Sequence, residues 1–414
     1  MGAPLALRGA ARSATARTAS LRYEDVPPLA HGALGAYVHV PFCSRICPFC
    51  PYNKVVPRTG QPERYFGALR SELDHYLAAG LVDADGFTSL YVGGGTPTLF
   101  PDLLATVVAD LPVAGEKAIE VLPTHAGPDL LDALERMGFT AVSIGVQSFS
   151  DDVLRRLRRP HDAASARAAV SWVVGRFPLV DADLILDVEY DDSRAGSFLR
   201  DLEECFDLGV DQVSTYPLMR FGYTPFGAAS HDRRREHEVL REATRLAGVH
   251  GYERRSVWTF NRLGAPSYTS ITRRRFLGLG AGSASFLGRD FFVNHFGVET
   301  YIDAVATGHP PVARHLHLGR AGGAAYDGFW QAYSGWFCLP LAGCHRLGPR
   351  GLDRYHDLER WVTYHLIEPL WAQMLAEHGV EDAHAGWAAP ERAHGTLFWP
   401  LVSRALERPG RLQV

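Results

Sequence analysis

The chain has 414 residues, of which 46% are hydrophobic and 21% charged, and a formal net charge of −4. This length accommodates one large catalytic domain with appendages, and the charge gives no global attraction to nucleic acid or to a membrane surface. No apolar run is long enough to predict a transmembrane helix, which needs about 20 residues. The six cysteines do not form the pattern of a secreted disulfide framework, so we expect a cytoplasmic protein.

Residues 1–22 are rich in Ala, Arg, Ser and Thr and contain no acidic residue. An organelle transit peptide has this composition. A disordered or loosely docked segment is the preferred interpretation, because few apolar residues are available to form a core. We therefore predict an N-terminal extension over residues 1–34.

Short apolar runs that predict buried strands then alternate with amphipathic runs that predict helices. The predicted strands are 36–40, 89–92, 118–122, 141–149, 179–187 and 212–218, and the predicted helices are 63–79, 129–137, 151–157, 164–174 and 197–208. This alternation predicts an α/β fold, with a parallel sheet and outer helices in a partial or complete β/α barrel. Functional residues of such barrels lie at the carboxyl ends of the strands.

The remaining sequence is less regular. The charged run His231–His237 is interpreted as a solvated helix face. We predict a core over residues 35–310 and a small, mainly helical C-terminal domain over 311–414 that covers the mouth of the barrel. Cys338 and Cys344 lie in this last part, and buried structural thiols are preferred over cluster ligands or covalent intermediates.

Three cysteines stand directly after the first predicted strand, as Cys43-x3-Cys47-x2-Cys50. Three thiolates on one loop can hold three irons of a 4Fe–4S cluster and leave the fourth iron open. A structural zinc site is the less favoured alternative, because zinc usually takes four ligands and the sequence has no second Cys-x2-Cys pair. The glycine run that begins at Gly93 follows the next strand, where backbone groups can approach a ligand closely.

With its flanking residues from Tyr37 to Phe42, this motif resembles the signature of radical S-adenosylmethionine (SAM) enzymes, in the branch typified by oxygen-independent coproporphyrinogen III oxidase. The resemblance covers residues 35–310. It implies that Cys43, Cys47 and Cys50 ligate the cluster and that SAM chelates the open iron. One electron, supplied by a reductant protein such as flavodoxin or ferredoxin, then cleaves SAM to a 5′-deoxyadenosyl radical.

The same resemblance implies further contacts with SAM. The expected residues are Tyr37 and Phe49 on the adenine, Gly94, Gly95 and Thr96 at the amino group, and Glu120, Gln147, Arg159 and Asp183 at other polar groups. Arg159 suits a carboxylate, because its planar fork binds both oxygens. Asp183 suits ribose hydroxyls, because a carboxylate accepts two hydrogen bonds. His39 is interpreted as a structural histidine.

The substrate side departs from the coproporphyrinogen oxidase pattern. Cys50 is followed by Pro51-Tyr52 where those enzymes carry Gly-Cys, and the segment that begins at Tyr268 also differs. These departures predict a relative that uses two SAM molecules to methylate or cyclopropanate an sp2 carbon. The expected partners are a small-molecule natural product and a partner methyltransferase. The alternatives are porphyrinogen decarboxylation, haem-ring methylation or opening, and a haem chaperone.

A second glycine-rich segment spans Gly278–Ser285. A dinucleotide fingerprint is rejected for it, because the segment does not follow the first strand of a βαβ unit. It resembles a segment near the active-site mouth of the family. We expect Gly280 and Ala281 to lie beside the second SAM molecule.

Overall fold

In the computed structural model the described residues are 15–16, 22–23, 26, 34–82, 86–109, 111–187, 196–227, 232–266, 275–339 and 343–377. The strands are β1 (Thr15–Ala16), β2 (Gly35–Val40), β3 (Ser89–Gly94), β4 (Lys117–Val121), β5 (Ala141–Gln147), β6 (Leu179–Leu186), β7 (Gln212–Pro217), β8 (Tyr252–Arg254), β9 (Thr259–Arg262), β10 (Phe276–Leu279), β11 (Ala284–Leu287), β12 (Asp290–Asn294), β13 (Val312–His317), β14 (Trp336–Leu339) and β15 (Gly343–Arg346). The α-helices are α2 (Gln61–Ala78), α3 (Pro101–Val108), α4 (Pro128–Arg136), α5 (Asp151–Arg156), α6 (Ala163–Val173), α7 (Gly196–Asp207), α8 (Arg233–Val249), α9 (Val298–Ala306), α10 (Arg320–Tyr333), α11 (Pro349–Val362) and α12 (Glu368–Glu377).

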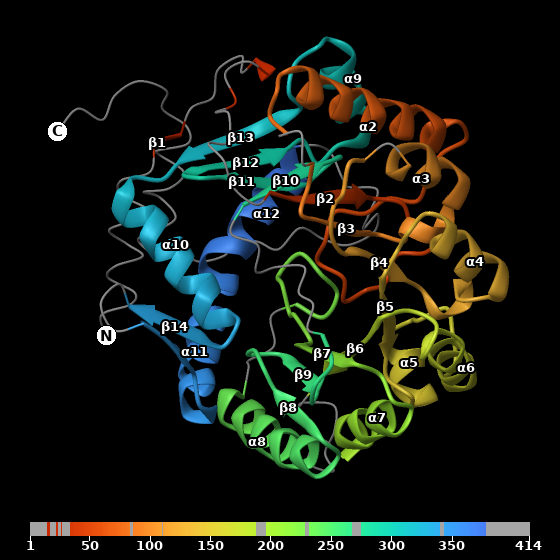
Figure 1. The fold of residues 1–414 in the computed structure, drawn as a ribbon, viewed down its shortest axis with the longest axis vertical. Coiled ribbons are helices and arrows are strands. Elements are labelled where there is room, and N and C mark those ends of the chain that lie inside the picture. The colour runs from red at the N-terminus through yellow and green to blue at the C-terminus, as the bar shows by residue number, and fades with distance from the viewer. Residues whose placement is uncertain are drawn as a thin grey trace.

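One curved sheet of 13 strands organises these elements, in the order β1-β13-β12-β11-β10-β2-β3-β4-β5-β6-β7-β9-β8. Neighbouring strands from β10 through β2 to β7 run parallel, and the strands outside this block run antiparallel. Figure 1 shows the sheet as an arc with α2 to α8 along its outer side. The fold is therefore the predicted α/β type, in the form of a partial barrel.

The parallel strands are buried because helices cover their outer face and side chains fill the inner one. In β5, five of the seven residues are buried, and the core around it includes Val142, Ile144 and Val146. Helix starts follow local chemistry as well. Asp162 caps α6 by accepting a 2.8 Å hydrogen bond from the Ser165 backbone N–H, which satisfies one of the free donors of the first turn.

The C-terminal part is helical, as predicted. Figure 1 places α10, α11 and α12 on the side where the arc of strands stays open. Helix α10 packs against the β14–β15 hairpin and against α11, and α11 contacts α8. No helix among the described residues is long and apolar enough to cross a membrane.

Three predictions about the ends of the chain need correction. Residues 312–317, assigned to the C-terminal domain, form β13 and pair with β12 in the main sheet. Part of residues 1–22, interpreted as disordered or loosely docked, forms β1, which pairs with β13 in the main sheet. Cys344 is exposed and disulfide-bonded rather than a buried thiol. Its register partner across the hairpin is Cys338.

Candidate active site

The three predicted cysteine ligands lie on one closed loop between β2 and α2. The loop is clamped at its base, where the Cys43 N–H donates to Val55 O at 3.0 Å and the Val55 N–H donates to Pro41 O at 2.7 Å. Buried Lys54 closes the loop from within by donating to the carbonyl oxygen of Cys50 and, at 3.0 Å, to that of Tyr52. A cation among carbonyl oxygens fixes the loop because these charge-assisted hydrogen bonds are strong.

The thiols differ in exposure. Cys43 is buried, whereas Cys47 and Cys50 are half-buried. Burial, and secondarily the nearby Cys50, raises the pKa of the Cys43 thiol to about 12. A free thiol of this kind stays protonated at neutral pH, and metal coordination is the chemistry that removes such a proton.

The glycine run after β3 packs directly on the cysteine loop. The Gly95 N–H donates to Val40 O and the Thr96 N–H donates to Phe42 O, both at 2.7 Å. A Cβ atom on Gly95 would lie 2.9 Å from Cys43 Sγ, so a side chain there would displace the thiol. The Thr96 hydroxyl lies 3.6 Å from the same sulfur. This cradle and the three-thiol donor set fit a 4Fe–4S cluster.

Glu120 on β4 reaches the glycine run from the neighbouring strand. It accepts a 3.1 Å hydrogen bond from the Gly94 N–H and another from the Tyr91 hydroxyl. Tyr37 stacks on Tyr91, with ring centroids 5.8 Å apart. Burial raises the pKa of Glu120 to about 7, so the carboxyl gains or loses its proton near neutral pH.

Arg159 joins the next strand to the cysteine loop. Its guanidinium donates to Gly145 O at 2.8 Å and lies 3.5 Å from Cys47 Sγ. Asp183 on β6 accepts a 2.9 Å hydrogen bond from the Ser143 hydroxyl. Burial, and then the charges of Asp181 and Glu120, raise the pKa of Asp183.

Gln147 ends β5 with a left-handed backbone, at a φ of 69°. Residues other than glycine rarely adopt this conformation, and such strain gathers at functional sites. Gln147 thus lies at the carboxyl end of β5, whereas Asp183 lies within β6 and Arg159 lies in the connection between α5 and α6. Their contacts with SAM, and that of half-buried Phe49, stay predictions.

His39 is a structural histidine, as interpreted from the sequence. Its Nε2 lies 2.9 Å from Asn53 O, and its Nδ1 lies 2.8 Å from the Tyr37 hydroxyl. Burial lowers the pKa of His39 to about 4, so the ring is neutral at pH 7.

The backbone amides of Gly280 and Ala281 are hydrogen-bonded to side chains of helix α2. The Gly280 N–H donates to Glu72 Oε2 at 2.8 Å, and the Ala281 N–H donates to the Tyr65 hydroxyl at 2.9 Å. Both amides thus have protein partners in this structure. Tyr268, expected nearby, lies outside the described residues.

Two residues of this region were missed by the sequence analysis. Asn53 ties the cysteine loop to the second glycine segment, through its amide N–H bonds to Ala281 O at 3.1 Å and Phe296 O at 2.9 Å. Glu72 is a fully buried acid on α2. An acidic residue on the apolar face beside Leu69 and Leu73 was the available signal for it.

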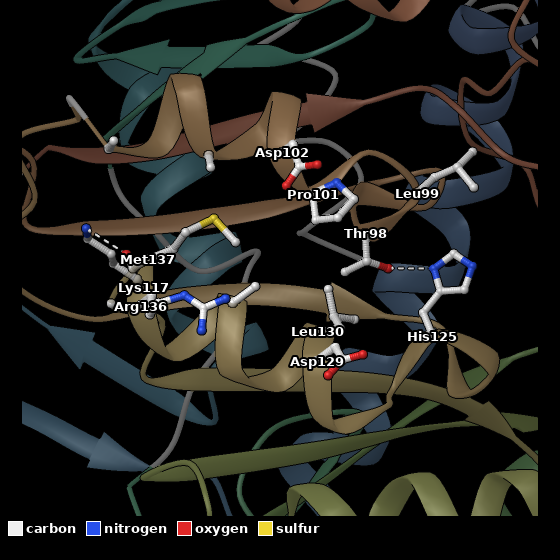
Figure 2. Close-up of a pocket in the computed structure, with 14 residues that line it drawn as sticks. Thr98, Leu99, Pro101, Asp102, Lys117, His125, Asp129, Leu130, Arg136 and Met137 are labelled. Atoms are coloured by element: carbon white, nitrogen blue, oxygen red, sulfur yellow. Dashed lines mark hydrogen bonds between the residues drawn. The ribbon is translucent and has the colours of Figure 1, made fainter.

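A cavity of about 980 Å³ lies elsewhere, between α3 and α4 on the outer side of the sheet (Figure 2). Its rim includes Thr98 and His125, whose Oγ1 and Nδ1 atoms lie 2.9 Å apart. None of the residues that line it is a predicted site residue. It therefore plays no part in the site assembled around the cysteines.

Comparison with known proteins agrees with this geometry. Residues 37–198 match the radical SAM superfamily. A haem chaperone HemW of Mycobacterium tuberculosis is 35% identical over 49% of this chain and 54% of its own length. The chain thus spans about half the length of that relative. An oxygen-independent coproporphyrinogen III oxidase of Cereibacter sphaeroides is 28% identical, over 67% of this chain and 68% of its own.

Among solved structures, coproporphyrinogen III oxidase (HemN) of Escherichia coli superposes with a TM-score of 0.65. The alignment covers 93% of this chain and 92% of HemN at 21% identity, a likeness that shows the fold alone.

These relatives overturn the predicted activity. They are named haem chaperones and coproporphyrinogen oxidases, so methylation or cyclopropanation of a natural product with two SAM molecules is wrong as the main interpretation. The natural-product substrate and the partner methyltransferase lose their support with it. Residues 37–198 thus carry a radical SAM domain, a family whose members use a 4Fe–4S cluster and SAM, and the chain is similar to oxygen-independent coproporphyrinogen III oxidases over two thirds of its length.

Proposed function

We propose that this chain binds a tetrapyrrole beside its cysteine loop and acts as a haem-handling radical SAM protein. The observation that carries the proposal is a group of aromatic side chains packed against the loop, which we call the aromatic wall. Its members are Tyr52, Phe221, Tyr223, Tyr364 and Trp371.

The wall joins the C-terminal region to the cysteine loop. Trp371 on α12 contacts Tyr52, with ring centroids 5.6 Å apart, and Phe221, with centroids 6.3 Å apart. The Tyr223 hydroxyl donates a 3.2 Å hydrogen bond to Pro51 O, next to Cys50. Tyr52 is 45% exposed and Phe221 is fully buried, so Tyr52 is the wall's ring that an incoming ligand can contact directly. Large flat apolar ligands pack well on such surfaces.

Cationic groups lie next to the wall. Arg220 precedes Phe221 in the chain, and its guanidinium lies 3.1 Å from Asp187 Oδ1. Arg156 lies 2.6 Å from the other oxygen of the same carboxylate. Guanidinium groups suit the carboxylate side chains of a haem, because they bind both oxygens of a carboxylate.

We favour the function of a haem chaperone over that of a coproporphyrinogen oxidase for two reasons. Several curated relatives, from four bacterial species, are named haem chaperones. In addition, Pro51 and Tyr52 replace the Gly-Cys of the oxidase pattern, and Tyr52 belongs to the aromatic wall.

Different residues of the chain would bind the cluster and SAM. Cys43, Cys47 and Cys50 would hold the cluster, which with SAM supplies one-electron chemistry when both are bound. Arg159 and Glu120 offer opposite charges for the carboxylate and the ammonium group of SAM. A flavodoxin or ferredoxin in the cytoplasm is the proposed electron donor.

The test is a haem titration of the anaerobically reconstituted full chain, followed through the haem absorption band. We expect saturation at one haem per chain. Trp371→Ala should weaken haem binding by about tenfold or more, because the loss of a buried aromatic contact costs about 1.5–3 kcal/mol. Trp172→Ala is the matched control, since Trp172 on α6 is 51% exposed and lies outside the wall.

A parallel incubation with SAM, reductant and coproporphyrinogen III separates the two tetrapyrrole activities. Stoichiometric haem binding without loss of carboxyl groups from the porphyrinogen supports the chaperone function. Decarboxylated product with no saturable haem binding would replace it with the oxidase function. That is the second candidate, because coproporphyrinogen oxidases match two thirds of this chain.

A further inference from the structure

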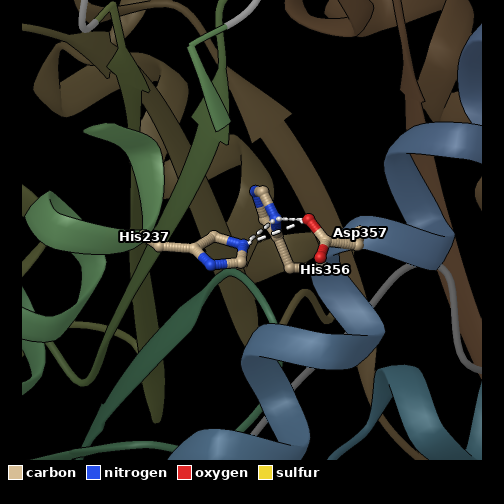
Figure 3. Close-up of side chains that lie close together, drawn as sticks. All are labelled: His237, His356 and Asp357. Atoms are coloured by element: carbon tan, nitrogen blue, oxygen red, sulfur yellow. Dashed lines mark hydrogen bonds and ion pairs between the residues drawn. The ribbon is translucent and has the colours of Figure 1, made fainter. Parts of the chain in front are cut away.

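A second group of metal-binding side chains lies between α8 and α11, and neither the cluster nor SAM uses it. Figure 3 shows His237 of α8 pointing toward His356 and Asp357 of α11. We propose that these three residues bind a Zn²⁺-class transition-metal ion, which ties the C-terminal helices to the barrel.

The separations among the three ligand atoms match a tetrahedral ion. His237 Nε2 lies 3.0 Å from His356 Nδ1 and 3.2 Å from Asp357 Oδ1, and the last two atoms are 3.7 Å apart. Two ligands of a tetrahedral zinc ion, each about 2.0 Å from the metal, are about 3.3 Å apart. One ion can therefore reach all three atoms with small side-chain rotations. Two imidazoles and one carboxylate are also an ordinary zinc donor set.

The buried histidine has the outer partner that metal-bound histidines usually have. His356 is fully buried, and its Nε2 lies 3.1 Å from Glu236 Oε2, at ion-pair distance but without hydrogen-bond geometry in this structure. The other oxygen of Glu236 accepts a 3.2 Å hydrogen bond from Arg360. A small rotation of either side chain would let this carboxylate accept a hydrogen bond from Nε2, which keeps the proton there and leaves the Nδ1 lone pair for a metal.

Hydrogen bonds alone satisfy this group poorly. His237 Nε2 carries at most one hydrogen, yet it faces both His356 Nδ1 and Asp357 Oδ1. The Asp357 Oδ1 atom is buried and accepts no well-formed hydrogen bond from the described residues. One cation would satisfy all three atoms together. Water can complete the coordination, because the Asp357 side chain is 42% exposed.

This position corrects the interpretation of His231–His237 as a solvated helix face only at Glu236 and His237, since Asp232, Arg233 and Arg234 are exposed as expected. Glu236 is buried, and the His237 side chain is only 20% exposed because α11 packs over it. Helix α8 connects β7 to β8 along the chain, whereas α11 belongs to the C-terminal region. An ion shared by the two helices would fix how that region sits on the sheet.

The test uses the full chain with its cluster assembled, so that zinc cannot occupy the cysteines. The protein is dialysed against micromolar buffered Zn²⁺, and zinc and iron per chain are measured by mass spectrometry. We expect one zinc per chain. X-ray absorption at the zinc edge should show nitrogen and oxygen neighbours at about 2.0–2.1 Å and no sulfur at about 2.3 Å.

Two variants with matched folding controls locate the ion. His237→Ala and Asp357→Asn should each weaken zinc binding by at least about tenfold. His250→Ala should not, although His250 ends the same helix, is 22% exposed and lies 3.4 Å from carboxylates of Glu203 and Asp207. Zinc should raise the melting temperature of the wild type and of His250→Ala, but not that of His237→Ala.

Three results would overturn the proposal: substoichiometric zinc in the wild type, sulfur neighbours around the zinc, or equal zinc affinity in His237→Ala. Each would leave the three side chains as a hydrogen-bonded contact between helices.

Discussion

Two regions of the molecule each enclose a glutamate whose pKa is raised by burial to about 7, yet the surroundings differ. Glu72 lies under the second glycine segment and accepts hydrogen bonds from Gly280 N–H at 2.8 Å, from the Asn294 amide at 3.0 Å and from the Tyr301 hydroxyl at 2.6 Å. Glu120 accepts from the Gly94 N–H and the Tyr91 hydroxyl and is only half-buried. An enclosed carboxylate with a full set of donors holds structure, whereas a half-buried one can meet a ligand.

The glycine run after β3 and the segment Gly278–Ser285 differ in the same way, one facing a candidate ligand site and the other the interior of the protein. A Cβ on Gly95 would lie 2.9 Å from Cys43 Sγ, a candidate metal ligand. A Cβ on Gly282 would lie 2.7 Å from the Asn53 amide nitrogen, a structural group. Glycine thus permits close approach in both places, to a candidate ligand thiol in one and to a structural side-chain amide in the other.

The largest effect is expected at the cysteine loop, which would hold the cluster. Cys47→Ala should abolish both the iron–sulfur absorption and SAM cleavage, because two thiolates cannot replace the three-thiol donor set. Iron and sulfide content and 5′-deoxyadenosine, measured by mass spectrometry, report the two losses. Cys205→Ala is the control, since Cys205 is a buried core thiol outside the loop. SAM cleavage at the wild-type rate in Cys47→Ala would contradict the cluster assignment.

A substitution at Glu72, under the second glycine segment, should change the stability of the protein instead. Glu72→Ala removes the acceptor of the Gly280 N–H and the Tyr301 hydroxyl and one of the acceptors of the Asn294 amide, so it should lower the free energy of unfolding by about 3–5 kcal/mol. Chemical denaturation of the protein measures this loss. Arg64→Ala is the comparison, because Arg64 and Glu299 form an exposed ion pair, 55% and 45% exposed, and solvent-screened pairs of this kind contribute little to stability. Equal losses in the two variants would refute the structural role of Glu72.

The sequence predicted the first half of the sheet well, because local patterns determine it. The strands β2 to β7 and the helices α2, α4, α5, α6 and α7 lie within a few residues of their predicted bounds, whereas α3 (Pro101–Val108) was not predicted. The cysteine loop was also predictable, since its three ligands fall within eight residues and follow a strand. Period and spacing are properties of short segments and can be read without a tertiary structure.

Long-range partners could not be predicted in the same way. The role of Glu72 depends on Gly280, more than two hundred positions away. His237 was interpreted as solvated because α11, which covers it, comes a hundred residues later. The substrate was mistaken for a related reason: departures such as Tyr52 show that the oxidase pattern is lost but do not show what takes its place.

Arg159 tests the region that is predicted to bind SAM. Arg159→Ala should weaken SAM binding by about 10- to 100-fold, because a charge-assisted hydrogen bond to a carboxylate is lost. Equilibrium dialysis with labelled SAM measures the affinity. Arg155→Ala is the matched control on neighbouring α5, since Arg155 is 69% exposed and pairs with Asp152. Unchanged affinity in Arg159→Ala would remove this residue from the SAM site.

Glu120 gives the smallest effect and tests the opening contrast directly. Its pKa of about 7 leaves about one-tenth of the carboxyl ionised at pH 6 and about three-quarters at pH 7.5. The ionised form attracts the ammonium group of SAM, so the affinity should rise with pH by up to about eightfold over this interval. Calorimetric titration with SAM at each pH measures this rise.

Glu120→Gln should bind SAM weakly and show a flat pH profile, because the amide does not ionise. Glu72→Gln should keep the wild-type slope, since Glu72 donors come from the protein and not from SAM. A slope that disappears in Glu72→Gln and persists in Glu120→Gln would exchange the roles of the two carboxylates. The raised pKa alone cannot distinguish them, because burial shifts both groups alike and only the ligand's charge acts on one of them.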